Sequence, residues 1–257
     1  RVPIKTLVGS TPEVLAMSPD LRIVPALSDK VWSVGRRPVY AVRLATGRTL
    51  RATGLHRVYG ANGWVRVSKL AAGDRLAVAR AIPEPTTSGP EWPEARLALL
   101  GHLIGDGSYL SGQPLRYTTA SEDNSQLVTK AAESEFGVRV TRNAGRGNWH
   151  QLVFSGNGNR WHPAGVNAWL RQLGIFGQRS YEKRIPESVF GLRNHQIAIL
   201  VRHLWATAGS IRVRPASSRG APRVFFATHS SGLAADVSAL LMRLGIVTRQ
   251  RVVIQGQ

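Results

Sequence analysis

Two stretches of this sequence share one order of elements, and this repetition is the feature that most constrains the fold. In each stretch an apolar helical segment ends at a glycine, Gly107 in the first and Gly209 in the second, 102 positions apart. Two strand-like segments follow, and then a second helix that is ended by Gly137 or Gly245, 108 positions apart. The six additional positions fit a longer loop between the strands of the second stretch (215–222). We interpret the pattern as a divergent internal duplication, with coincidence as the alternative.

The rest of the chain has a different pattern. Residues 1–82 contain short alternating segments separated by glycine, proline and asparagine, which predicts β-structure. Residues 83–93 hold four prolines and little apolar content, as is typical of a linker between domains. The predicted organisation is a β-rich domain (1–82), a linker (83–93), a domain of two repeats (94–250, with repeats near 94–186 and 187–250) and the start of a return to the first domain (251–257).

The charge of the chain indicates the class of its partner. There are 34 Lys and Arg against 15 Asp and Glu, a net charge of +19, and residues 201–257 hold eight arginines and a single acid, Asp236. This excess favours a polyanionic partner, of which nucleic acid is the commonest. Only five of the basic residues are lysines. Arginine suits bidentate recognition of phosphate and guanine, although a GC-rich genome would produce the same ratio.

Several classes of protein are not expected. No window of 18 uncharged apolar residues occurs and the first residues lack the apolar core of a signal peptide, so we expect no membrane partner and a cytoplasmic location. The absence of cysteine excludes a disulfide-stapled module, a thiol-ligated zinc finger and a thiol nucleophile within these residues. The histidines show no metal-ligand spacing, so zinc is not expected either. We expect the chain to be a monomer.

The first helix of each repeat carries the most specific motif. Residues 99–107 have the sequence LLGHLIGDG and residues 201–209 have the sequence VRHLWATAG. The first resembles the LAGLIDADG motif of homing endonucleases, and the second resembles another copy of it. The resemblance implies an α+β domain of two αββαββα repeats with a pseudo-two-fold axis, in which the motif helices lie side by side and each half places a four-stranded sheet over duplex DNA. Small residues would permit the close approach of the helices: Gly101, Gly105, Ala206 and Thr207.

The acid at the end of each motif carries the chemistry of this family. The resemblance implies that Asp106 binds a divalent cation, Mg²⁺ or Mn²⁺, with Gly107 and Gly209 contributing to the metal site. Hydrolysis of a phosphodiester uses such a cation to polarise the phosphate and to generate hydroxide. The second motif has Ala208 where the family has its other acid, either naturally or by substitution. We therefore expect a chain that binds DNA but cleaves it poorly or not at all. The alternative for Asp106 is an aspartate that merely ends a helix.

A third motif lies shortly before the second repeat. The sequence Lys183-Arg184-Ile185-Pro186 resembles the Lys-x-Ile-Pro block of intein-borne homing endonucleases. The resemblance implies a catalytic role for Lys183, in contact with the reacting phosphate or its solvent network, where an ammonium group stabilises developing negative charge. The alternative is an ordinary solvated lysine beside a proline.

The N-terminal region resembles the splicing domain of inteins. The resemblance is carried by the Thr53-x-x-His56 pair, by the Gly63-Trp64 dipeptide and by the Leu-x-x-Gly-Asp sequence of residues 70–74. These blocks, with the first seven residues, are most similar to the intein of bacterial replicative DNA helicases. The resemblance implies a mainly β, Hint-type splicing domain in which Thr53 and His56 surround the N-terminal scissile amide, with segments of the host helicase as flanking exteins. We expect that residues 1–257 alone do not splice, because they contain neither an N-terminal cysteine or serine nor a C-terminal His-Asn pair.

Three functions remain open from the sequence. The leading one is an intein-encoded homing endonuclease that recognises a long intein-less insertion site in duplex DNA. The second is a non-catalytic DNA-binding protein with the same fold, which Ala208 favours and the intein-like blocks disfavour. The third is a basic RNA-binding protein, which would leave both motif helices unexplained. For the first two, arginines on the inferred strands are candidates for contacts in the major groove: Arg116, Arg212, Arg214 and Arg223.

Overall fold

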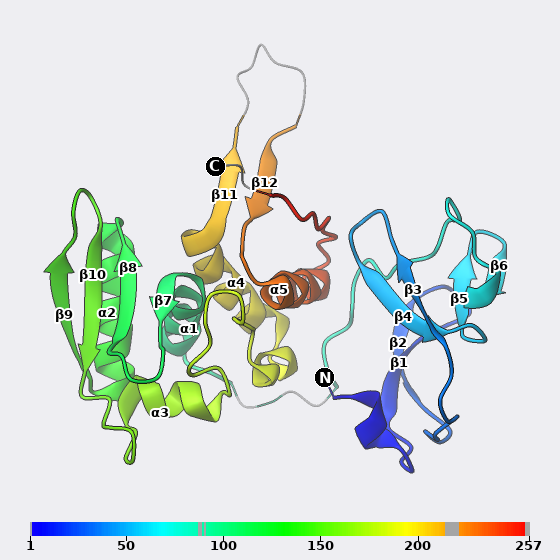
Figure 1. Cartoon of the computed structure of the whole chain (residues 1–257), viewed down its shortest axis with the longest axis horizontal. Coiled ribbons are helices and arrows are strands. Elements are labelled where there is room, and N and C mark those ends of the chain that lie inside the picture. Colours follow the sequence, from blue (N-terminus) through cyan, green and yellow to red (C-terminus); the bar gives the residue numbers. More distant parts are fainter. Residues whose placement is uncertain (1, 87–88, 90, 214–220, 255–257) are drawn as a thin grey trace. The chain divides into compact units, whose positions relative to one another are not determined.

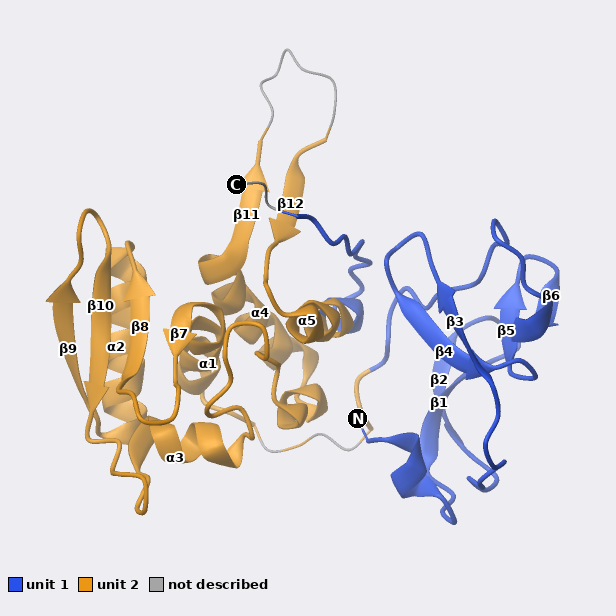
Figure 2. Ribbon diagram, in the orientation of Figure 1, with its two compact units in different colours: residues 1–83, 241–257 blue, residues 84–240 orange. Residues whose placement is uncertain are grey.

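The structure is a computed structural model that describes residues 2–86, 89, 91–213 and 221–254. The chain divides into two compact units, unit 1 with residues 1–83 and 241–257 and unit 2 with residues 84–240 (Figure 2). In the described part of the chain, no helix combines the length and the apolar character that a membrane crossing requires.

Unit 1 is built from three antiparallel hairpins of two strands each (Figure 1). Within residues 2–83 only Val67 is buried, so the three hairpins contribute little apolar core. The strands agree with the β-structure expected for this region. The elements are η1 (Ile4–Leu7), β1 (Glu13–Met17), β2 (Ile23–Leu27), β3 (Val39–Arg43), β4 (Thr49–Thr53), β5 (Arg57–Gly60), β6 (Gly63–Arg66) and η2 (Val67–Lys69).

After α5 (Ser231–Arg243) the chain returns to unit 1. Two backbone hydrogen bonds hold the returning segment, one from the Ile82 N–H to the Met242 carbonyl (3.2 Å) and one from the Gln250 N–H to the Thr46 carbonyl (2.7 Å). By their contacts, residues 241–257 group with unit 1.

The first half of unit 2 has the element order αββαββα that was predicted for a repeat. Its four strands form one antiparallel sheet in the order β7-β8-β10-β9. Apolar side chains alternate along the two central strands and are buried on the face that α1 and α2 contact. The elements are α1 (Glu94–Asp106), β7 (Gly107–Ser108), β8 (Leu115–Thr119), α2 (Glu122–Phe136), β9 (Arg139–Ala144), β10 (His150–Ser155) and α3 (Gly165–Gln172).

The second half of unit 2 is shorter than the first. It contains η3 (Glu187–Gly191), α4 (Asn194–Ala208), β11 (Gly209–Arg212), β12 (Arg223–Phe226) and α5 (Ser231–Arg243). Within the described residues its sheet has two strands, so the expectation of a four-stranded sheet in each half is wrong for this half. The physical reason lies after α5, where the described residues 244–254 form no strand and are bonded to unit 1 instead.

The motif helices α1 and α4 lie side by side, as the sequence predicted (Figure 1). A Cβ added at Gly101 would lie 2.8 Å from the Leu204 backbone nitrogen, and one added at Gly105 would lie 2.5 Å from the Thr207 Cβ. The two glycines are therefore required for the contact between the helices, because any larger side chain would push the backbones apart.

Candidate functional site

Asp106 is the last residue of α1, and the chain enters β7 directly after it. The Gly107 N–H donates to the Leu103 carbonyl and ends the helix. Part of Asp106 is exposed to solvent, but surrounding protein atoms remove water from its carboxyl group and raise its pKa. The positive charge of Lys183 acts in the opposite direction and lowers the pKa. The end of α1 therefore presents one accessible carboxyl group beside one cation.

Lys183 is not a solvated surface lysine, since only 8% of its surface is exposed. Its ammonium group donates to the Gly105 carbonyl (2.8 Å) and to the Gly107 carbonyl (2.9 Å), on either side of Asp106. It also lies 5.5 Å from the centre of the Tyr109 ring. Burial lowers the pKa of Lys183 to about 8, although the Asp106 carboxyl acts to raise it. The structure thus brings together two residues that the sequence analysis singled out from motifs far apart in the chain.

Ala208 ends α4 in the way that Asp106 ends α1. Gly209 follows it with extended backbone, and its N–H donates to the Trp205 carbonyl. The contact between Gly105 and Thr207 holds the ends of the two helices next to one another. The methyl group of Ala208 offers no ligand for a cation, so the end of α4 has no counterpart of the Asp106 carboxyl group at the end of α1.

The donor set fits one divalent cation better than a site with two carboxylates. Within the described residues, no group of three or more His, Asp or Glu side chains is arranged to hold a metal. The Gly107 carbonyl already accepts a hydrogen bond from Lys183, and Gly209 would add only backbone groups. Mg²⁺ keeps several waters and is commonly held by one or two carboxylates together with substrate phosphates. Asp106 is able to serve as that single carboxylate.

Two buried histidines form a hydrogen-bonded chain between α1 and α4. His102 Nδ1 lies 2.9 Å from the Tyr117 hydroxyl, and His203 Nδ1 lies 3.3 Å from His102 Nε2. Burial, together with the charge of the neighbouring His203, lowers the pKa of His102 to about 4. Burial and the positive charge of Arg202 also lower the pKa of His203. The sequence analysis tested these histidines only for zinc spacing and missed their pairing.

The hydrogen-bonded pair of His102 and His203 makes the stability of unit 2 sensitive to acid. The pKa of His102 is about 4 in the folded protein and about 6.5 when unfolded, so the unfolded chain binds more protons between these values. The free energy of unfolding should therefore fall as pH decreases from 6.5 to 4. The titration of His102 should account for about 3 kcal/mol of this decrease. The measurement is urea unfolding across this range. His102→Gln should reduce the slope, whereas His162→Gln, at an exposed histidine, should leave it unchanged. Equal slopes in all three proteins would contradict the prediction.

One face of the four-stranded sheet is polar and basic. Arg116 alternates with the buried Leu115 and Tyr117, so it projects from the face of the sheet opposite α1 and α2. The strand register identifies the residues that share this open sheet face, and none of them is acidic. The sequence analysis missed most of them, although the alternation of residues 139–143 and 150–155 would have revealed them. The open sheet face consists of Ser108, Arg116, Thr118, Arg139, Thr141, Asn143, Gln151, Val153 and Ser155.

The two-stranded sheet of the second half carries a smaller basic face. Arg212 and Arg223 lie directly opposite one another in the antiparallel register. The guanidinium carbon of Arg212 lies 5.7 Å from the centre of the Phe225 ring on the same face. Phe226 projects from the other face and packs against Trp205 of α4. Arg214, the fourth arginine proposed from the sequence, is outside the described residues.

Thr53 and His56 lie on one tight turn in unit 1. The His56 N–H donates to the Thr53 carbonyl (3.1 Å), and the Val67 N–H donates to the His56 carbonyl (2.8 Å). His56 is exposed and Thr53 is half-buried. The turn therefore brings the backbones of Thr53 and His56 together in unit 1.

Comparison with known proteins gives one family match and several relatives. Residues 195–256 match the family model described as a LAGLIDADG-like domain. The replicative DNA helicase DnaB of Rhodothermus marinus is 42% identical over 265 residues, which is 100% of this chain and 28% of the helicase. DnaB of Synechocystis sp. is 34% identical over 257 residues, 97% of this chain and 29% of the helicase. The chain thus spans less than a third of the curated relatives that it matches.

The likeness to solved structures is weaker. The crystal structure of I-DmoI in complex with DNA and Mn superposes with a TM-score of 0.37 and 15% sequence identity, over 60% of this chain and 79% of that chain. A likeness at this level carries no inference about this protein.

Proposed function

We propose, with the LAGLIDADG-like domain of residues 195–256 as the premise, that unit 2 binds duplex DNA at a specific site and belongs to a homing endonuclease. The observation that carries the proposal is the open sheet face, on which guanidinium, amide and hydroxyl groups occur without any carboxylate. These groups are the ones that read base edges in the major groove, where arginine pairs with guanine and asparagine or glutamine with adenine. The net charge of +19 supports contacts with the DNA phosphates, which contribute binding energy that does not depend on sequence.

The end of α1 would supply the cleavage chemistry. Asp106, with backbone groups of Gly107 and Gly209, would hold Mg²⁺ or Mn²⁺, which when bound polarises the phosphate and activates water. The Lys183 ammonium, hydrogen-bonded beside Asp106, would stabilise negative charge that develops on the phosphate oxygens. Because Ala208 leaves one carboxylate missing, we propose that cleavage by this chain is weak.

Unit 1 would be part of a protein-splicing domain. The chain aligns over its full length with a segment of a replicative DNA helicase, which supports an intein interrupting such a helicase. In that setting, Thr53 would bind the scissile amide and His56 would protonate or distort it, as their place on one turn allows. The flanking exteins would be the two parts of the host helicase.

One observation favours a second function. The methyl side chain of Ala208 lies where a second catalytic carboxylate would be needed, and it favours a DNA-binding protein that has lost cleavage. This candidate differs from the first in activity only, since both bind duplex DNA through the same sheet.

A single assay tests the proposal. The chain is incubated with Mg²⁺ and a duplex carrying the helicase coding sequence without the insertion, and a gel resolves shifted complex, nicked product and double-strand product. We expect a specific shift with little cleavage. Double-strand cleavage would mean that the second acid has been misassigned, and the lack of any shift beyond that of a scrambled duplex would refute specific binding at this site.

Arg116 is expected to contribute sequence discrimination. If it reads a base, Arg116→Ala should weaken binding to the specific duplex by about 1–3 kcal/mol and leave binding to a scrambled duplex nearly unchanged. If it contacts only phosphate, both affinities should fall together and the dependence on salt should become shallower. Fluorescence anisotropy at several salt concentrations separates these results.

The matched control for Arg116 is Arg142. It lies in the same sheet but points to the helix side, where it pairs with Glu122 at 2.7 Å. Arg142→Ala should therefore leave the specific affinity within a factor of about two. If Arg142→Ala weakens binding as much as Arg116→Ala, the open sheet face is not the DNA-binding surface.

A further inference from the structure

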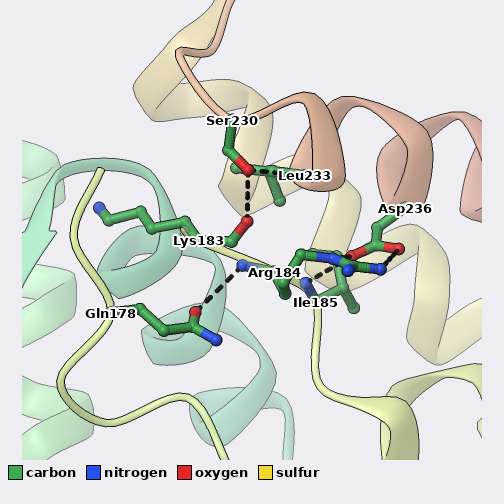
Figure 3. A network of polar contacts seen from close by, with 7 residues as sticks. All are labelled: Gln178, Lys183, Arg184, Ile185, Ser230, Leu233 and Asp236. Atoms are coloured by element: carbon green, nitrogen blue, oxygen red, sulfur yellow. Dashed lines mark hydrogen bonds and ion pairs between the residues drawn. The ribbon is translucent and has the colours of Figure 1, made fainter. Parts of the chain in front are cut away.

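We propose that α5 positions Lys183, through Ser230 immediately before the helix and Asp236 within it. We call Ser230 and Asp236, with their hydrogen bonds to residues 183–185, the clamp. Its geometry is observed independently of any function, whereas its role in DNA hydrolysis rests on the function proposed above. Figure 3 shows the arrangement, in which the backbone of Lys183 faces α5 and its side chain extends away from Asp236. Ser230 and Asp236 belong to the second half of unit 2, and Lys183 reaches the end of α1 in the first half.

Asp236 is completely buried, with no exposed surface. Its two carboxylate oxygens accept from Arg184 at 2.6 Å (Nε) and 2.9 Å (Nη2), and one of them also accepts from the Ile185 N–H at 3.1 Å. A buried carboxylate is tolerated only where such partners compensate for the loss of water. The Asp236 carboxylate thereby fixes the two residues that directly follow Lys183.

Ser230 holds Lys183 itself. Its hydroxyl donates to the Lys183 carbonyl at 2.8 Å and accepts from the Leu233 N–H at 3.1 Å, so one side chain both caps α5 and binds the backbone of Lys183. Ser230 is buried, which shields both hydrogen bonds from water.

The segment that carries Lys183 needs this support. No helix or strand is assigned to residues 173–186, and turn hydrogen bonds hold them in place of a regular ladder, among them the one from the Lys183 N–H to the Arg179 carbonyl (3.1 Å). On the other side of the segment, the Gln178 side chain accepts from the Arg184 N–H at 3.1 Å. Ser230 and Asp236 bind three consecutive residues, 183–185, and so fix the backbone position of Lys183. From this position its side chain reaches the Gly105 and Gly107 carbonyls. Without the clamp, the segment and the ammonium would sample other positions.

The test measures the chemical accessibility of Lys183 in the full chain. The protein is treated with a limiting amount of acetyl N-hydroxysuccinimide ester, and peptide mass spectrometry gives the acetylation rate of each lysine. Lys130, exposed on α2 in the same unit, is the internal reference. The rates are measured at several pH values and compared as rate constants of the neutral amine, because burial lowers the pKa of Lys183 to about 8 and so increases its neutral fraction. In the unsubstituted protein we expect this rate constant to be at least about tenfold smaller for Lys183 than for Lys130, because Lys183 is buried and hydrogen-bonded.

Two variants remove different parts of the clamp. Asp236→Asn weakens the bonds to Arg184 and Ile185, and Ser230→Ala removes the bond to the Lys183 carbonyl. Each should raise the rate at Lys183 about tenfold, the equivalent of one hydrogen bond, without changing the rate at Lys130. Ser230→Thr retains the hydroxyl and should keep Lys183 protected. Glu135→Gln, which breaks an Arg–carboxylate pair of 2.8 Å elsewhere in unit 2, is the matched control and should have no effect on Lys183.

The outcomes separate this proposal from the proposed function. If the variants that fold, judged by circular dichroism, leave the rate at Lys183 unchanged, the clamp is refuted. If Asp236→Asn fails to fold, Ser230→Ala and Ser230→Thr decide the question alone. A protein whose Lys183 responds as expected but that binds no specific duplex would retain the clamp and refute the DNA-binding function.

Discussion

Ala208→Asp is expected to raise Mg²⁺-dependent cleavage of the specific duplex by about 100-fold or more. The substitution places a second carboxylate at the end of α4, directly beside the helix end that carries Asp106. Two carboxylates hold a divalent cation more tightly than one, and stabilisation of transition-state charge by such a cation amounts to several kcal/mol. The measurement is the rate of product formation under single-turnover conditions, with nicked and linear products resolved on a gel.

Two further proteins control for this gain of activity. Ala208→Asn has nearly the shape of aspartate without its charge and should remain as inactive as the unsubstituted chain. Asp106→Asn combined with Ala208→Asp restores a single carboxylate at the opposite helix end and should lose most of the gain. If Ala208→Asp binds the duplex but cuts no faster than the unsubstituted chain, position 208 is not the place of the missing acid, and the non-catalytic DNA-binding function gains support.

Gly101→Val is expected to lower the free energy of unfolding of unit 2 by about 2–4 kcal/mol. An added Cβ would lie 2.8 Å from the Leu204 backbone nitrogen and 2.9 Å from the Leu200 carbonyl oxygen. These atoms belong to the α4 backbone and cannot move aside as a flexible side chain would, so α1 and α4 must separate. The packing of α1 against α4 would then be lost in part. Urea unfolding monitored by tryptophan fluorescence measures the change.

Gly191→Val is the matched control in the same unit. A Cβ at Gly191 would meet no atom within 4 Å and its φ is not in the left-handed region, so the substitution should cost less than about 1 kcal/mol. Equal destabilisation by both substitutions would contradict the view that the contact between α1 and α4 is what requires glycine at position 101.

The helices and hairpins could be expected from sequence because their signals are local. The end of α1 at Asp106 and of α4 at Ala208 follows from a glycine after an apolar helical segment. Gly137 caps α2 with φ at +62°, as a closing glycine should. The glycines at positions 101 and 105 predict a close helix contact from the sequence, and both lie against α4 in the structure.

The site was predictable only as a set of residue types. Lys183 stood out through its motif, but its burial against the Gly105 and Gly107 carbonyls joins positions 78 and 76 residues apart. The pairing of His102 with His203 joins positions 101 residues apart, and each histidine alone looks like an ordinary core residue. The number of strands in the sheet of the second half was overestimated. No local signal in the sequence shows that residues 244–254 form no strand and bond to unit 1 instead.

The sequence by itself therefore determined the two similar helices, their terminal residues Asp106 and Ala208, and the positive charge that favours nucleic acid. The tertiary structure alone decided that Lys183 is buried beside Asp106, that Asp236 binds Arg184 across 52 positions, and that Arg116 and Arg139 share a sheet face free of acids. The physical reason is the range of the interactions. Helix periodicity and capping depend on residues within one or two turns, whereas burial, ion pairing and strand register depend on which distant segments the folded chain brings together.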